Sequence, residues 1–236
     1  MANKKKKTLT PEQKLAARKA LILFLGIALG LVVLDCVSKW AVQLNCIPNH
    51  AYEVIPNFFY ITLSYNTGAA FSAGANWGIG GRILGIAISL GMSFVILFYW
   101  VRHNEELRTF ERVIASLLAA GAVGNLIDRS FYFTAITGFD GVIDFFQFYL
   151  GGGPNAGINF LNPFATFNIA DACLVVGILL FIVLIIMDTV KNSSKSELRE
   201  DPRLKKQVKE AEEDEEEEEP KEDEEVPEKK DEEPKD

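Results

Sequence analysis

Two aspartates stand where a carboxylate is costly. Asp144 lies in the segment VIDFF and Asp171 ends the segment FNIAD, so both have apolar and aromatic neighbours and neither has a Lys or Arg within a helical turn. Two carboxylates that meet in apolar surroundings cannot both ionise cheaply, so one holds a proton near neutral pH while the other stays charged. The charged group can then take a proton from water while the protonated group polarises a carbonyl. The pair therefore predicts hydrolysis of a peptide bond, provided that the fold brings the two aspartates together.

Four more charged residues fall within apolar segments or at their ends, where an ionisable group costs at least ~2.5 kcal/mol. Asp35 and Lys39 are four residues apart, on one helical face, and can pair. Asp128 and Arg129 close another apolar segment. We interpret these two pairs as groups that find ionic partners and fix helix packing.

The elements that must position these residues are four apolar segments. A bilayer core of about 30 Å needs about 20 largely apolar helical residues. Four such segments in so short a chain leave too little polar sequence to cover them in a soluble protein. The sequence therefore predicts a membrane all-α fold with four transmembrane helices, at about 20–44, 83–101, 113–131 and 167–188.

Basic residues predict how these spans are oriented. Lys and Arg collect before the first span, between the second and third, and after the fourth. Basic segments of this kind stay in the cytoplasm, so we expect both termini to be cytoplasmic. Loops 45–81 and 132–166 then face the periplasm, and the charged cluster lies near that face.

The two periplasmic loops differ in character. Residues 53–66 (EVIPNFFYITLSYN) are rich in β-branched and aromatic residues and partly alternate, which predicts short strands in a small periplasmic β-sheet. The stretch 146–164 contains GGGPNAG, and it is either a flexible lid or a tolerated insertion. We expect this second region to form an extracytoplasmic loop.

Composition separates a basic membrane body from an acidic tail. The net charge is -8, but residues 209–236 hold 18 of the 32 acidic residues and 5 of the 24 basic ones. Because this tail is almost without apolar residues, we expect 191–236 to be disordered in the cytoplasm, after a basic N-terminus at 1–19 and a four-span domain at 20–190. The cysteines and histidines lack metal-ligand spacing, so neither a metal nor another cofactor is expected.

Five short motifs lie at the ends of the expected spans. They are DCVSK (35–39), YNTGAAF (65–71), GAVGNLIDR (121–129), VIDF (142–145) and FNIAD (167–171). In type and order they resemble the motifs of lipoprotein signal peptidase, the type II signal peptidase of bacteria. The resemblance departs at Ala120, which stands where the family pattern GGxxGN has its first glycine, and in the acidic tail.

The resemblance implies a multi-pass aspartic endopeptidase of the bacterial inner membrane. Such an enzyme removes the signal peptide from diacylglyceryl-modified prolipoproteins and cuts just before the lipidated cysteine. Its partners would be these prolipoproteins and membrane lipids, with no nucleic acid and no cofactor, and we expect a monomer. The catalytic pair would be Asp144 and Asp171. The matching positions that bind substrate or brace the site would be Asn66, Asn125, Asn168, Arg129, Asp35, Lys39, Asp128, Gly121 and Ala170.

Two other functions could use the same residues. A small proton-coupled transporter would use the carboxylates as a proton relay. However, the charges lie at one face of the membrane, and the sequence shows no inverted repeat or pair of broken helices. A catalytically inactive lipid-binding scaffold would share the fold, although the intact Asp144 and Asp171 argue against it.

Overall fold

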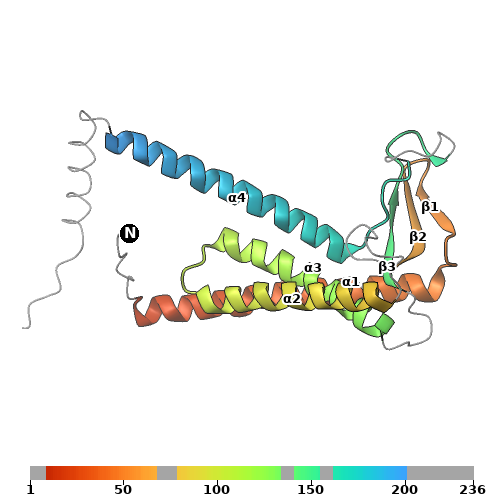
Figure 1. Ribbon diagram of the computed structural model, residues 1–236, viewed down its shortest axis with the longest axis horizontal. Coiled ribbons are helices and arrows are strands. Elements are labelled where there is room, and N and C mark those ends of the chain that lie inside the picture. The colour runs from red at the N-terminus through yellow and green to blue at the C-terminus, as the bar shows by residue number, and fades with distance from the viewer. Residues whose placement is uncertain (1–8, 68–78, 134–140, 155–161, 201–236) are drawn as a thin grey trace, which may run out of the picture. The chain divides into compact units, whose positions relative to one another are not determined.

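The computed structural model describes residues 9–67, 79–133, 141–154 and 162–200. These residues form four helices and three strands (Figure 1). All four helices are long and apolar enough to cross a membrane, which confirms the predicted four-span fold. The chain divides into a compact unit that ends at Val183 and a second unit that begins at Leu184, and the site described below lies wholly in the first. The helices are α1 (Pro11–Asn45), α2 (Ile79–His103), α3 (Thr109–Phe133) and α4 (Ile169–Glu200), and the strands are β1 (Ala51–Ile55), β2 (Phe59–Asn66) and β3 (Val142–Phe148).

Helix α1 begins ahead of its predicted span because its first turn carries a complete start signal. Thr10 caps the helix by accepting a hydrogen bond from the Gln13 N–H, and the Gln13 side chain accepts one from the Thr10 N–H. Pro11 occupies the first turn, where its missing N–H costs nothing. The helix therefore starts in the basic segment and runs through the whole predicted span to Asn45.

Helix α3 is the central helix of the bundle. Of its apolar span, 44% is buried inside the protein, against 17–22% for the other three helices. One apolar cluster joins its Ala119 to Ala28 of α1 and Trp100 of α2, and a second joins its Ala120 to α1 and to Cys173 of α4. The polar residues near the C-terminal end of α3 are consequently surrounded by the other elements.

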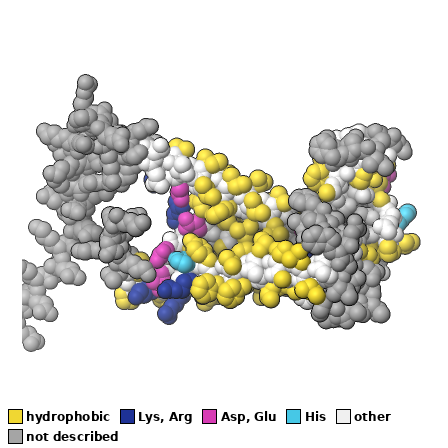
Figure 2. All heavy atoms as spheres, in the orientation of Figure 1, with side chains coloured by type: hydrophobic (Ala, Val, Ile, Leu, Met, Phe, Trp, Pro, Cys, Tyr) yellow, Lys and Arg dark blue, Asp and Glu magenta, His cyan; other side chains and the backbone are white. Residues whose placement is uncertain are grey.

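The outer surfaces of the helices are apolar. Side chains of Phe94, Val95, Phe98 and Tyr99 on α2 are each more than half exposed. Figure 2 shows such apolar side chains along the helices, with most of the charged side chains visible in this view at the left end of the helices. Exposed apolar surface of this extent marks a region that contacts lipid or protein rather than water.

The three strands form one antiparallel sheet in the order β1-β2-β3. Strand β2 and most of β1 lie in the segment 53–66 for which the sequence predicted strands, whereas β3 lies in the loop 132–166 and was not predicted. Leu63 of β2 packs with Ile143 and Phe145 of β3, and this cluster rests on Val42 of α1 and Ile169 of α4. The sheet is thereby fixed to the helix ends that carry the polar residues.

Helix α4 corrects the predicted boundary of the tail. It continues to Glu200, so residues 191–200 are helical rather than disordered. The segment KNSSKSELRE contains no glycine or proline, so no residue in it interrupts the helix. The remainder of the predicted tail, 201–236, lies outside the described residues, as do 155–161 of the predicted lid or insertion.

Candidate active site

Asp144 is presented by β3 and held by two asparagine side chains. It is 4% exposed. Its Oδ2 accepts a hydrogen bond of 3.2 Å from the side-chain amide of Asn66, and its Oδ1 accepts one of 2.7 Å from that of Asn168. Because Ser64 pairs with Asp144 and Asn66 with Val142, Asn66 and Asp144 are diagonal neighbours on one face of the sheet.

Asp171 lies in the first turn of α4 and forms a reciprocal cap with Asn168. The Asn168 Oδ1 accepts a 2.9 Å hydrogen bond from the Asp171 N–H, and the Asp171 Oδ2 accepts a 3.2 Å bond from the Asn168 N–H. This is the arrangement of a capping box, which satisfies two donors that a helix start would otherwise leave unpaired. The other oxygen of Asp171 accepts a 2.8 Å hydrogen bond from the side-chain amide of Asn125 on α3.

Asn168 therefore joins the two aspartates. It has no exposed surface, its amide nitrogen donates to Asp144, and its amide oxygen accepts from the Asp171 backbone. The structure thus brings together the two carboxylates that are 27 residues apart in the chain, which the sequence only permitted.

The surroundings of Asp144 favour its protonated form. Burial, and then the negative charge of Asp171, raise the pKa of Asp144 to about 7, although the hydrogen bonds from Asn66 and Asn168 act in the opposite direction. Burial has this effect because a charged carboxylate loses its hydration, and the neighbouring carboxylate adds repulsion. The pair is therefore suited to hold one proton near neutral pH.

A buried ionic cluster holds the backbone on both sides of the pair. The Lys39 ammonium lies 2.6 Å from the Asp35 carboxylate and 2.9 Å from that of Asp128. The Asp35 Oδ1 accepts a 2.8 Å hydrogen bond from the Ala170 N–H, next to Asp171. The Asp128 Oδ2 accepts a 3.2 Å bond from the Ile143 N–H, next to Asp144. One lysine thus connects the segments that carry the two aspartates.

This cluster both confirms and changes the predicted ion pairs. Asp35 and Lys39 pair as their spacing predicted. Asp128, however, pairs with Lys39 and not with its neighbour Arg129. Successive residues of a helix point about 100° apart, so Asp128 faces α1 while Arg129 reaches α2, where its NH1 donates a 2.7 Å hydrogen bond to the Ser89 Oγ.

Two glycines of α3 allow α1 and α4 to pack closely around the ionic cluster. A Cβ on Gly121 would lie 2.5 Å from the Ala170 carbonyl oxygen and from the Leu174 side chain. A Cβ on Gly124 would lie 2.8 Å from the Asp35 Oδ2 and 3.0 Å from the Ala170 Cβ. Ala170 is 1% exposed, so a larger side chain has no room there either. Gly121 and Ala170 were expected from the resemblance, whereas Gly124 was missed although it lies three residues after Gly121, on the same face of the helix.

A cleft of about 110 Å³ opens beside Asp171. Asn125 and Arg129 of α3 line it, as do Ser89 of α2 and Leu174 of α4. Asp171 is partly exposed, in contrast to Asp144. Ser89 was not predicted, because a serine in an otherwise uncharged span gives no signal that distinguishes it from a packing residue.

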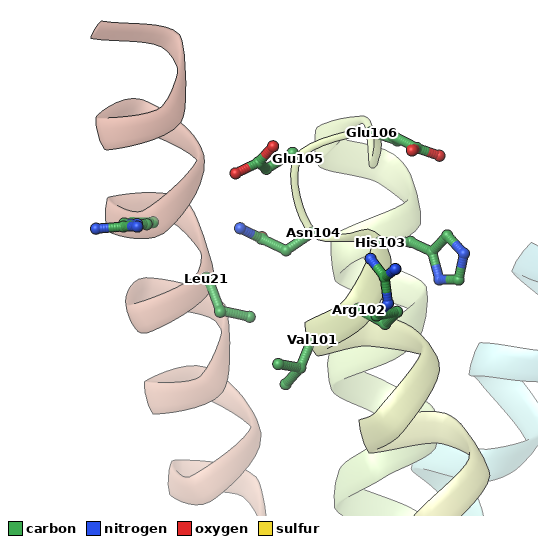
Figure 3. A pocket seen from close by; sticks show the side chains of 8 residues that line it. Leu21, Val101, Arg102, His103, Asn104, Glu105 and Glu106 are labelled. Atoms are coloured by element: carbon green, nitrogen blue, oxygen red, sulfur yellow. The ribbon is translucent and has the colours of Figure 1, made fainter. Parts of the chain in front are cut away.

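A larger pocket, of about 320 Å³, lies at the other end of the helices (Figure 3). Figure 3 shows Asn104 and Glu105 from the turn between α2 and α3 facing Leu21 of α1. Arg18, which also lines this pocket, is about 25 Å along α1 from Asp35, so the pocket is separate from the aspartate pair.

The described part of the chain offers no group of three or more His, Cys, Asp or Glu side chains that could hold a metal ion. What the site does offer is a carboxylate pair in which the pKa of Asp144 is raised to about 7, next to a cleft with amide and guanidinium donors. That arrangement can activate water and polarise a carbonyl without any further group.

A family model described as Signal peptidase (SPase) II matches residues 27–187. The chain belongs to the signal peptidase II family. This family is a family of proteases, and all the residues of the pair and the ionic cluster fall inside the matched segment.

Individual relatives of the family agree with this membership. The chain is 34% identical over 168 residues to a lipoprotein signal peptidase of Symbiobacterium thermophilum, covering 71% of this chain and 97% of that protein. It is 33% identical over 170 residues to a lipoprotein signal peptidase of Staphylococcus aureus, covering 72% and 91%. A bacterial membrane enzyme solved at 2.3 Å resolution superposes with a TM-score of 0.55 at 30% identity, covering 71% of this chain and 89% of that one. The signal peptidase II family thus accounts for the four spans and the small sheet.

Proposed function

We propose that this protein removes the signal peptide from diacylglyceryl-modified prolipoproteins, with Asp144 and Asp171 as its catalytic pair. The proposal rests chiefly on one observation, the Asn168 side chain that links the two aspartates at the start of α4. A proton relay for transport would need carboxylates at successive depths of the membrane, whereas these two lie side by side at one end of the spans. No relative named above is a transporter.

In the proposed reaction, Asp144 holds the proton and Asp171 the negative charge. Asp144 is the more buried of the two, and the N-terminal end of α4 favours a negative charge at Asp171. Asp171 would accept a proton from water as the water oxygen bonds to the scissile carbonyl carbon. Asp144 would at the same time give its proton to the carbonyl oxygen, so that no separated charge remains in the tetrahedral intermediate.

The second half of the reaction would return both groups to their starting states. As the carbon–nitrogen bond breaks, Asp171 passes its new proton to the leaving amine of the lipidated cysteine, and Asp144 recovers a proton from the hydroxyl that becomes the new carboxyl group. Each carboxylate thus acts once as acid and once as base. The signal peptide leaves with a free carboxylate and the lipoprotein with a free amine.

The ionic cluster and the three asparagines would hold the two catalytic aspartates in position without reacting themselves. Asp35 and Asp128 hold the backbone N–H groups beside the two aspartates, and Lys39 neutralises both of these carboxylates. We assign these three residues a positioning role. Asn66, Asn125 and Asn168 already use amide donors on the catalytic carboxylates, and would keep them oriented when substrate enters.

The distribution of basic residues supports an active site near the periplasmic face and both termini in the cytoplasm. A site at this depth would leave the two acyl chains of the substrate in lipid while its peptide bond reaches water. Membrane lipids would then surround the apolar outer surfaces of the helices, and one copy of the chain contains every residue that the reaction needs. We therefore propose that the enzyme acts as a monomer.

The test is cleavage by the purified full-length protein in detergent or lipid. Wild-type protein should cut a diacylglyceryl-modified prolipoprotein and leave the unmodified precursor intact. Asp144→Asn and Asp171→Asn should each abolish cleavage while the protein remains folded in the membrane. Full activity in either variant would rule out the catalytic pair, and cleavage of both precursors at equal rates would rule out the proposed substrate.

A further inference from the structure

Arg129 is the cation of the cleft and is held from α2. Its side chain lines the cleft with Asp171 and Asn125. Among the described residues Arg129 forms no ion pair, and its NH1 donates a 2.7 Å hydrogen bond to the Ser89 Oγ. A guanidinium has five N–H donors, so four remain for other partners in the cleft.

Two residues of helix α2 contact the Arg129 side chain. Ser89 is 6% exposed, and it lies one helical turn after Gly85 on the same face of α2. A Cβ on Gly85 would lie 3.4 Å from the Arg129 Nε and 3.5 Å from its Cδ, so the stem of the arginine runs closely past this glycine. Gly85 thus leaves space for the aliphatic part of the Arg129 side chain, while Ser89 binds its guanidinium group.

We propose that Ser89 is a positioning residue for cleavage: its hydroxyl orients the Arg129 guanidinium so that the remaining donors face the cleft beside Asp171 and bind carbonyl oxygens of the substrate backbone. This inference rests on the proposed function. Without the Ser89 hydroxyl, this long side chain would lose the hydrogen bond that holds its guanidinium and would sample other rotamers in the partly open cleft. A hydrogen bond to a charged group is directional and stronger than a neutral one, so it suits this role.

The first experiment compares three variants of the full-length protein in cleavage of a diacylglyceryl-modified prolipoprotein. Ser89→Cys keeps the size of the side chain but makes only a weak hydrogen bond, and kcat/KM should fall about tenfold, the size expected for losing one hydrogen bond to a charged group. Ser89→Thr keeps the hydroxyl and should retain most of the activity. Ser93→Cys is the matched control, because Ser93 is buried one turn further along α2, and its hydroxyl donates to the Ser89 carbonyl oxygen and not to Arg129.

A double-mutant cycle separates positioning of Arg129 from a general effect on packing. Arg129→Lys removes the planar fork that Ser89 orients, so adding Ser89→Cys to Arg129→Lys should cause little further loss. If the two substitutions instead lowered kcat/KM by independent factors that multiply in the double variant, Ser89 would not act through Arg129.

Other outcomes would also overturn the inference. If Ser89→Cys kept the wild-type kcat/KM, the Ser89 hydroxyl would have no role in positioning Arg129. The same would follow if Ser89→Thr were as impaired as Ser89→Cys. Neither result would contradict the proposed function. A wild-type protein that cleaved neither precursor would overturn the proposed function, and this inference with it.

Discussion

Replacing Asp144 with asparagine should abolish activity and, at alkaline pH, make the protein more stable. The pKa of Asp144 is raised from 3.8 to about 7, first by burial and then by Asp171. The folded protein therefore binds a proton more tightly than the unfolded chain does. The stability that Asp144 contributes is full below its unfolded pKa and is lost as the pH rises through its folded pKa.

The size of the effect follows from the shift. Each pKa unit corresponds to about 1.4 kcal/mol, so the full loss is at most about 4 kcal/mol, and about 3 kcal/mol of it falls between pH 5 and pH 8. Asparagine has one oxygen where Asp144 uses two as acceptors, so Asp144→Asn gives up one of two hydrogen bonds. This costs about 1 kcal/mol at every pH. At pH 5 the wild type has already lost about 1–2 kcal/mol, so the variant should be about as stable as wild type there, and at pH 8 it should be about 3 kcal/mol more stable.

Thermal unfolding in detergent at several pH values between 5 and 8 measures how the two stabilities diverge as the pH rises. A difference of about 3 kcal/mol at pH 8 corresponds to a shift of roughly 6–12 °C in unfolding temperature for a chain of this size. Glu105→Gln is the control, because it removes an exposed carboxylate at the other end of the helices and should follow the wild-type curve. If the difference in unfolding temperature between wild type and Asp144→Asn stayed constant across this pH range, folding would not raise the pKa of Asp144.

Three further predictions concern the surroundings of the pair. Asn66→Ala removes a hydrogen bond that lowers the pKa of Asp144, so the alkaline limb of the pH–rate profile should move to higher pH; an unchanged limb would contradict this role. Gly124→Ala should destabilise the protein by about 1–3 kcal/mol through overpacking, whereas Gly91→Ala, with nothing within 4 Å of its added Cβ, should not; equal unfolding temperatures for the two variants would refute the close approach. Deleting 201–236 should leave the cleavage rate unchanged, because the basic residues predict that the tail and the site lie on opposite sides of the membrane. Loss of activity in a folded truncated protein would show otherwise.

The sequence by itself determined the features that depend on neighbours along the chain. Four apolar segments of sufficient length become four helices, because backbone hydrogen bonding inside a membrane leaves few alternatives. The alternation in 53–66 becomes β1 and β2. The i,i+4 spacing of Asp35 and Lys39 becomes an ion pair, since a helix places such residues on one face whatever surrounds it.

Only the tertiary structure decided which distant groups meet. Asp128 binds Lys39 because of how α3 is rotated against α1, and no local rule distinguishes that orientation from one that pairs Asp128 elsewhere. The third strand, β3, exists because β2 offers it an edge, and the register of those two strands puts Asn66 beside Asp144. Asn168 links the two aspartates because the residue before it, Phe167, forms backbone hydrogen bonds with Phe145 and Phe146 in the middle of β3. Contacts of this kind join segments that are far apart in the chain, so they depend on the packing of the whole domain and not on any segment alone.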